Sequence, residues 1–105
     1  SNKNRLKDSI VDISPRIINK TSKIKCFGKR AFSCAGFSLT NVACGKVEAA
    51  ILFESYPWDF YPGKIIIEEA RGKVTDLKGK EVSFSTRNII ASNSLVHKQI
   101  LKYVH

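Results

Sequence analysis

Apolar residues recur along the chain in two patterns, short runs rich in β-branched residues and longer stretches with helical spacing. The short runs predict strands over residues 9–13, 23–27, 47–53, 73–77 and 88–91. The helical spacing predicts helices from about Phe32 to Gly45, from Asp59 to Gly72 and after Asn93 or Ser94, and Ser14-Pro15 predicts a short helix over 16–20. Strands that alternate with helices are typical of an α/β fold, here a single layered α/β/α domain with a mostly parallel, mixed sheet of about five strands flanked by helices.

The pattern of apolar residues alone does not decide the structure of residues 65–67 and 78–84. Ile65-Ile66-Ile67 is β-branched, but Asp59 suits the N-cap of a helix, Pro62 then falls in its first turn, and the run continues to Gly72. We therefore expect a helix there. The turn residues 78–80 lie between two short runs, so residues 81–84 are expected to return as the second strand of a hairpin.

Length and composition predict one domain with a modest core. The chain has 105 residues, of which 43% are hydrophobic and 26% charged. Residues 1–7 hold a single apolar side chain and are expected to be a flexible lead-in to a domain over 8–105. The sequence has no apolar run near the roughly 20 residues that cross a bilayer. Three cysteines without a C-x-x-C pair indicate small buried thiols in a reducing compartment, so we expect a cytoplasmic location and no membrane.

The positive charge is concentrated in the amino-terminal third. The net charge is +9, and residues 1–31 carry nine Lys or Arg against two Asp, a net of +7. Such a segment attracts polyanions, either nucleic acid or a phosphorylated small molecule. The basic residues are not expected to be interleaved with exposed aromatic residues, and no helix-turn-helix, RRM or KH signature is present, so nucleic acid is the less favoured partner.

Asp59 is the strongest candidate for chemistry. It follows the apolar run 49–53 and a short loop, which places a carboxylate at the carboxyl end of a strand, where open α/β sheets bind ligands. The alternative is that Asp59 only caps a helix and Trp58 only fills a core. The two histidines have no zinc spacing, and no G-x-S-x-G nucleophile elbow is present.

The motifs around Asp59 resemble a known family. They are Trp58-Asp59, Gly63, Glu69-Ala70, Gly72, Val74-Thr75-Asp76, Ile90-Ala91-Ser92-Asn93 and His97. In this order and spacing they are similar to the carboxyl-terminal half of the inositol monophosphatase family, magnesium-dependent and lithium-sensitive phosphatases that act on inositol phosphates or, in some members, on fructose bisphosphate. The resemblance implies that Asp59 is a metal ligand close to the substrate.

The resemblance also implies a substrate pocket. The family has Arg-x-x-Gly-Ser/Thr-Ala at a helix start that helps to hold the sugar ring, and here Ser33, Cys34 and Ala35 occupy the last three positions after Arg30. A thiol at residue 34 forms weaker hydrogen bonds than the family's hydroxyl. The alternative is a helix start that only packs on the sheet. Glu54 is a candidate for the family's substrate-facing glutamate, or else a solvated loop carboxylate.

The family's other metal-ligand motifs are missing from this sequence. Most ligands come from an amino-terminal half with a Gly-Glu-Glu segment and an Asp-Pro-x-Asp-Gly-Thr/Ser segment, and neither occurs here. The resemblance therefore implies a lobe that needs Mg²⁺ and an N-terminal phosphatase lobe, is inactive alone and forms a homodimer within the full protein. The alternatives are a non-catalytic interaction or dimerisation domain and, less favoured, a basic nucleic-acid-binding module.

Overall fold

A computed structural model describes residues 1–15, 23–32 and 34–104. Its elements are η1 (Leu6–Asp8), β1 (Ile10–Ile13), β2 (Gly28–Arg30), α1 (Ala35–Ala43), β3 (Ala49–Leu52), α2 (Pro57–Glu69), β4 (Lys73–Thr75), β5 (Ile89–Ser92) and α3 (His97–Leu101). The helix expected over 16–20 and the candidate residue Ser33 lie outside the described residues.

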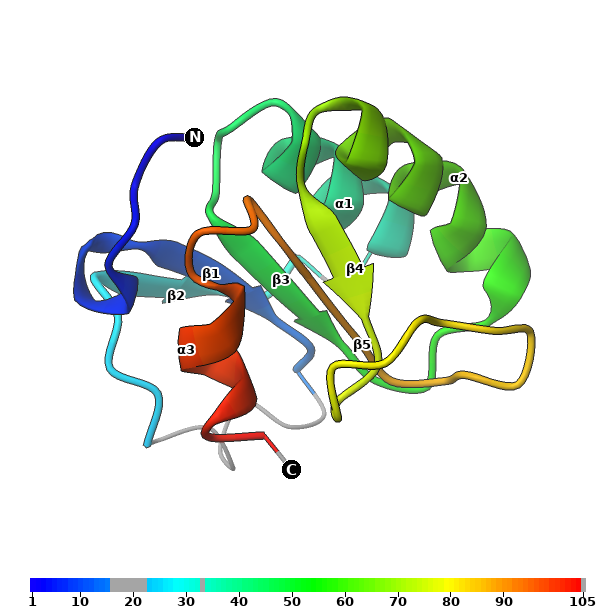
Figure 1. The fold of residues 1–105 in the computed structure, drawn as a ribbon. Helices are drawn as coiled ribbons and strands as arrows, with labels where there is room; N and C mark the ends of the chain where they lie inside the picture. Colours follow the sequence, from blue (N-terminus) through cyan, green and yellow to red (C-terminus); the bar gives the residue numbers. More distant parts are fainter. Residues whose placement is uncertain (16–22, 33, 105) are drawn as a thin grey trace.

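The five strands form one mixed sheet in the order β2-β1-β3-β5-β4 (Figure 1). Strand β1 is parallel to both β2 and β3, whereas β5 runs antiparallel to β3 and to β4. Four strands therefore share one direction and β5 alone runs against them. The expectation of a mostly parallel, mixed sheet of about five strands is confirmed.

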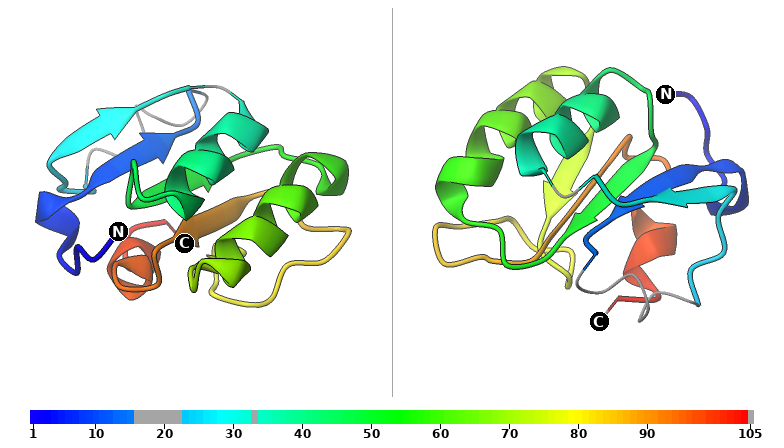
Figure 2. Two further views of the ribbon diagram at one scale, coloured as in Figure 1. Left: turned by 90° about the horizontal axis from the view of Figure 1, so that it is seen from above. Right: turned by 180° about the vertical axis from the view of Figure 1, so that it is seen from behind.

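Helices cover both faces of the sheet. Helices α1 and α2 lie side by side on one face and α3 lies on the other (Figures 1 and 2). Alternate residues of β3 serve the two cores: Ala50 and Leu52 pack towards α1 and α2, while Ala49 and Ile51 join the core beneath α3. All four residues are buried, which explains the uninterrupted apolar run. The layered α/β/α fold is confirmed.

Two expected strands are wrong. Residues 23–27 are not a strand, and Phe27 is 75% exposed; the strand is β2, which follows directly and pairs Gly28 with Ile10. Strand propensity did not locate it because the register with β1 decides which residues pair. Residues 81–84 leave the predicted turn without forming a strand. Val82 instead packs into the core, and its carbonyl oxygen accepts a hydrogen bond from the Tyr61 hydroxyl at 3.2 Å.

The terminal helix begins later than the sequence indicates. Its N-cap is Val96, not Asn93 or Ser94. The Asn93 side chain still stabilises the turn before the helix, because its Oδ1 accepts hydrogen bonds from the backbone N–H groups of Leu95 at 3.0 Å and Val96 at 3.2 Å. Asn93 therefore stabilises the turn ahead of α3 and does not cap the helix.

The first residues of the chain contact its carboxyl-terminal part. Leu6 is buried, and its N–H donates to Gln99 Oε1 of α3 at 2.7 Å, while the Asn93 side chain donates to the Lys3 carbonyl at 2.8 Å. These contacts hold residues 1–7 against the carboxyl-terminal part of the fold; the flexibility of this segment stays a prediction.

The expectation of buried thiols is wrong, since Cys34 and Cys44 are exposed and Cys26 is half-buried, and all three are unpaired.

Candidate functional site

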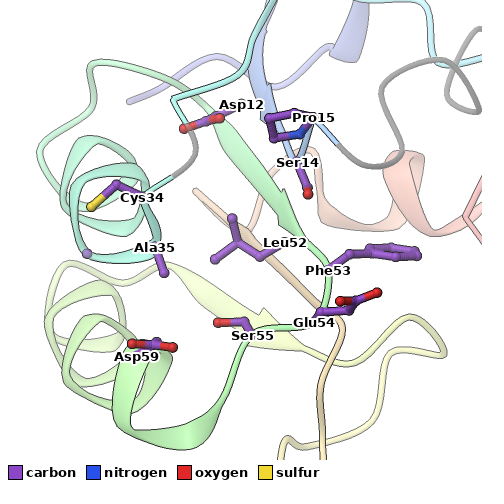
Figure 3. Close-up of a pocket in the computed structure, with 11 residues that line it drawn as sticks. Asp12, Ser14, Pro15, Cys34, Ala35, Leu52, Phe53, Glu54, Ser55 and Asp59 are labelled. Carbon is purple, nitrogen blue, oxygen red and sulfur yellow. The ribbon is translucent and has the colours of Figure 1, made fainter.

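A cavity of about 580 Å³ lies at the carboxyl ends of two neighbouring parallel strands, beside the first turns of α1 and α2 (Figure 3). The end of β1 contributes Asp12, Ser14 and Pro15; the start of α1 contributes Cys34, Ala35 and Gly36; the end of β3 and its loop contribute Leu52, Phe53, Glu54 and Ser55; α2 contributes Asp59. Open α/β sheets bind ligands at this edge. Four of the sequence-predicted site residues, Cys34, Ala35, Glu54 and Asp59, therefore line one cavity.

Asp59 lies in the first turn of α2 but does not cap it. The helix begins at Pro57 after the N-cap residue Tyr56, so Asp59 is its third residue and the predicted N-cap is wrong. Proline is favoured at the first helical position because its fixed backbone angle suits the helix and it has no N–H to satisfy. Asp59 is exposed, and the part of the chain that the structure describes offers its carboxylate no hydrogen-bond or ion-pair partner. Trp58 is 73% exposed, so it does not fill the core.

The loop after β3 is fixed in an uncommon conformation. Glu54 has a φ of 55°, a left-handed conformation that few residues other than glycine adopt. Two hydrogen bonds hold the loop: Glu54 N–H donates to Asn88 Oδ1 at 3.1 Å, and Ser55 N–H donates to the Arg87 carbonyl at 2.7 Å. In Figure 3 the Glu54 carboxylate points away from Asp59, so the two acidic groups face different parts of the cavity.

The start of α1 forms the opposite wall. Cys34 is its N-cap residue, but its side chain makes no capping hydrogen bond, and the thiol points away from Asp12 in Figure 3. Ala35 is half-buried and its methyl group points towards the cavity. The first N–H groups of a helix lack partners within the helix and carry partial positive charge. The starts of α1 and α2 therefore both favour a negatively charged ligand.

Sequence reasoning missed two buried polar residues of the cavity, Asp12 and Ser55, and the half-buried Ser14. Asp12 is 1% exposed; its Oδ1 accepts a hydrogen bond from the Phe32 N–H at 3.3 Å, and its Oδ2 has no hydrogen-bond partner among the described residues. Ser55 is 6% exposed, and its hydroxyl also has no hydrogen-bond partner in the described part of the chain. A signal for Asp12 was present, because a carboxylate inside a β-branched strand needs a reason to be there. Ser55 carries no such signal in the sequence.

The cavity has acidic but no basic side chains among the described residues that line it. Asp12, Glu54 and Asp59 contribute carboxylates, and no Lys or Arg belongs to this lining. A phosphorylated ligand therefore requires a cation beside it. Within residues 1–15, 23–32 and 34–104, no group of three or more His, Cys, Asp or Glu side chains is arranged to hold a metal ion. The acidic residues of this chain can supply part of a cation site, and further ligands must complete it.

Comparison with known proteins places the chain in a family. The sequence profile of the inositol monophosphatase family matches residues 2–105, which is nearly the whole chain. The chain belongs to the inositol monophosphatase family. It is 35% identical over 101 residues to the fructose-1,6-bisphosphatase/inositol-1-monophosphatase of Thermotoga maritima, covering 92% of this chain and 38% of that protein. It is 34% identical over 88 residues to a putative Nus factor SuhB of Neisseria meningitidis, covering 84% of this chain and 34% of that protein.

Solved structures of inositol monophosphatases have the same fold. The crystal structure of inositol monophosphatase II from Staphylococcus aureus superimposes with a TM-score of 0.88 at 28% sequence identity, covering all of this chain and 44% of that one. The chain thus spans between about a third and a little under half of the length of the relatives it matches. These comparisons establish the family and the fold of the chain. The activity of a whole protein is the subject of a proposal.

Proposed function

We propose that the chain is the carboxyl-terminal lobe of a Mg²⁺-dependent phosphate monoester hydrolase of the inositol monophosphate or sugar bisphosphate class. In this proposal Asp59 is a metal ligand and the cavity is part of the substrate pocket. The observation that carries it is the position of Asp59: an exposed carboxylate in the first turn of α2, on the wall of a cavity at the carboxyl ends of β1 and β3.

The residues fit Mg²⁺ as a partial site. Mg²⁺ prefers carboxylate oxygens and holds its waters unless several oxygens replace them. Asp59 offers one such oxygen, and the described residues do not complete a set. An N-terminal phosphatase lobe would supply the other ligands from across the cavity. When bound, the cation offsets the phosphate charge and activates the attacking water. Sensitivity to lithium and a cytoplasmic location belong to the same proposal.

The start of α1 would orient the substrate. The backbone N–H groups of Ala35 and Gly36 lie in the first turn, where they favour an electronegative group, and Ser33 and Cys34 precede them. The exposed Cys34 thiol is a weak hydrogen-bonding group, so the main chain carries most of this role. Glu54 would contact a different part of the substrate, because its carboxylate points away from Asp59 (Figure 3).

A non-catalytic interaction or dimerisation domain is the second candidate. It is supported by an exposed aromatic surface, in which Trp58 is 73% and Phe84 76% exposed and Tyr56 stacks on Trp58 with ring centroids 4.9 Å apart. Exposed apolar surface of this kind favours association. Both candidate functions are compatible with a homodimer of the full protein. Nucleic-acid binding stays the less favoured alternative, although Phe27, which is 75% exposed, lies among the basic residues of the amino-terminal third.

A chimera tests the catalytic proposal. In it, this chain replaces the matched part of the Thermotoga maritima relative. We expect Mg²⁺-dependent phosphate release from inositol monophosphate, and we expect Asp59→Asn to lower kcat/KM by about 100-fold or more, since a lost metal ligand weakens stabilisation of the transition state. The matched control is Asp8→Asn, which removes an exposed carboxylate outside the cavity and should leave kcat/KM unchanged.

A second measurement does not depend on folding of the chimera. Mn²⁺ added with inorganic phosphate to the ¹⁵N-labelled 105-residue chain should broaden the amide signals of residues 57–61 in the wild type and in Asp8→Asn, but not in Asp59→Asn. Equal activity of the Asp59→Asn and wild-type chimeras would contradict the proposed role of Asp59. Equal broadening of these signals in the wild type and in Asp59→Asn would contradict it too.

A further inference from the structure

The start of α2 is held from outside the helix, by the end of the loop that joins β4 to β5. The N-cap residue Tyr56 forms no side-chain capping hydrogen bond. We propose that Arg87 and Asn88 are positioning residues for Asp59. They hold residues 54–56 in place and thereby fix where α2 begins and where the Asp59 carboxylate lies. The inference rests on the proposed function, because it names the residues that place the proposed metal ligand.

Three consecutive residues before α2 are each held by the end of this loop. The Glu54 N–H donates to Asn88 Oδ1 at 3.1 Å, and the Ser55 N–H donates to the Arg87 carbonyl at 2.7 Å. The Arg87 guanidinium lies over the Tyr56 ring, with Cζ 4.5 Å from the ring centroid. A guanidinium in this position is attracted by the negative face of the ring. Because β5 follows directly after Asn88, these contacts tie the start of α2 to the sheet.

Arg87 is itself fixed by the loop. Its Nη1 donates to the carbonyl oxygens of Phe84 at 2.7 Å and Thr86 at 3.0 Å. The Phe84 ring lies against Tyr61 of α2, with centroids 5.1 Å apart, and the Tyr61 hydroxyl donates to the Val82 carbonyl at 3.2 Å. Figure 1 shows the loop, in yellow and orange, beside the start of α2. A planar guanidinium held in this way loses little further freedom when it packs on a ring.

Tyr56 determines where Asp59 lies. Its carbonyl oxygen accepts hydrogen bonds from the N–H groups of Asp59 at 2.8 Å and Phe60 at 3.2 Å. A shift of Tyr56 therefore moves the first turn of α2 together with the Asp59 carboxylate. The Trp58 ring stacks on the Tyr56 ring, with an angle of 11° between their planes. Because Arg87 and Trp58 both pack on Tyr56, these side chains order the first turn without a capping side chain.

The positive charge of Arg87 makes the positioning role testable. A positive charge in the neighbourhood of a cation site repels the cation, so its removal would strengthen cation binding if charge alone mattered. If Arg87 positions Asp59, its removal weakens cation binding instead. Groups that orient a metal ligand typically cost tenfold or more in metal affinity when they are lost. The two effects have opposite signs.

The first measurement uses no metal. Trp58 is the only tryptophan of the chain, so its fluorescence anisotropy reports on the first turn of α2. In the 105-residue chain we expect Arg87→Met and Arg87→Lys to lower this anisotropy, because a planar guanidinium no longer packs on Tyr56. The matched control is Lys80→Met, which removes an exposed positive charge from the same loop and should leave the anisotropy unchanged.

The second measurement is the Mn²⁺ concentration that, with inorganic phosphate present, half-broadens the amide signals of residues 57–61. We expect this concentration to rise about tenfold in Arg87→Met. It should rise about threefold in Arg87→Lys, which keeps the charge, and in Asn88→Ala, which removes one hydrogen-bond acceptor. Lys80→Met should leave it unchanged or lower it. A purely structural role would reduce the stability to urea of the Arg87 variants without changing this concentration.

The outcomes separate this inference from the proposed function. If Asp59→Asn abolishes the broadening but both Arg87 variants broaden at the wild-type Mn²⁺ concentration or below it, the proposed function stands and the positioning role is overturned. An unchanged Trp58 anisotropy in both Arg87 variants also overturns it. If Asp59→Asn does not reduce the broadening, the proposed function fails and no positioning role towards a metal remains. If Arg87→Met does not fold, Arg87→Lys decides.

Discussion

His97 is a buried imidazole whose two nitrogens are both hydrogen-bonded. Its Nδ1 lies 2.7 Å from Ser92 Oγ and its Nε2 lies 2.7 Å from Thr75 Oγ1, and Thr75 donates its hydroxyl hydrogen to the Asp76 carbonyl at 2.8 Å. Nε2 must therefore carry the proton, and Ser92 donates to Nδ1. Burial, with a contribution from the positive charge of Lys73, lowers the pKa of His97 from 6.5 to about 4. The residue joins β4, β5 and α3 as a neutral hydrogen-bonding group.

The lowered pKa predicts a loss of stability in acid. Between pH 6.5 and about 4 the unfolded chain binds a proton at residue 97 that the folded chain does not, so the contribution of His97 is complete above pH 6.5 and falls as the pH drops towards 4. Over this window we expect a loss of about 3 kcal/mol. Urea unfolding of the wild type and of His97→Gln from pH 7 to pH 4 measures it.

The variant should be less stable at pH 7 and show a shallower dependence on pH. His105→Gln, which removes the other histidine of the chain, controls for the loss of an imidazole as such. Equal pH slopes in the wild type and in His97→Gln would contradict the assignment of a neutral, buried His97.

At the scale of elements, the approach of α1 to α2 depends on Gly63. A Cβ atom added at this buried position would lie 2.6 Å from Leu39 Cδ1 and 2.7 Å from Leu39 Cβ. Helix α2 already contains Pro62, which removes one N–H from its second turn. The absence of a side chain at residue 63 therefore lets α2 pack on α1 and places Asp59 beside the cavity.

We expect Gly63→Ala to lower the free energy of unfolding by about 1–3 kcal/mol, because the extra methyl group separates the two helices. Gly36→Ala is the matched control: a Cβ atom at residue 36 meets nothing within 4 Å, so stability should stay the same or rise slightly. Thermal or urea unfolding compares the two variants. Equal stabilities of Gly63→Ala and Gly36→Ala would show that the two helices do not require the close contact.

At the scale of the whole molecule, this chain forms a layered domain with a candidate site at one edge of its sheet. The chain covers 38% of the Thermotoga maritima relative and 44% of the Staphylococcus aureus structure. The described residues contain no helix long and apolar enough to span a membrane. The cavity combines two helix starts with acidic side chains, but the described residues assemble no complete metal site.

We expect the isolated 105-residue chain to release no measurable phosphate from inositol monophosphate at millimolar Mg²⁺, because too few oxygens are present to hold the cation tightly. Colourimetric phosphate assays of the chain, with the active chimera as the positive control, provide the measurement. Turnover by the isolated chain at ordinary enzyme rates would show that it assembles a complete site by itself.

The sequence determined the order of most elements and the position of the strongest candidate residue. The apolar run at residues 49–52 forms a strand buried on both faces, and the run at 65–67 is helical although its residues are β-branched. Asp59 was placed correctly at the end of a strand and the start of a helix, because local pattern and turn chemistry suffice for that. These features depend on neighbours within a few residues along the chain.

Only the tertiary structure decided what depends on contacts between distant segments. The register with β1 moved the edge strand from residues 23–27 to Gly28–Arg30. Asp12 and Ser55 are 43 positions apart, and the parallel pairing of β1 with β3 brings both to one cavity. Hydrophobic periodicity cannot predict such contacts between distant residues. It indicates which face of a strand a residue occupies, but not which other strand ends beside it.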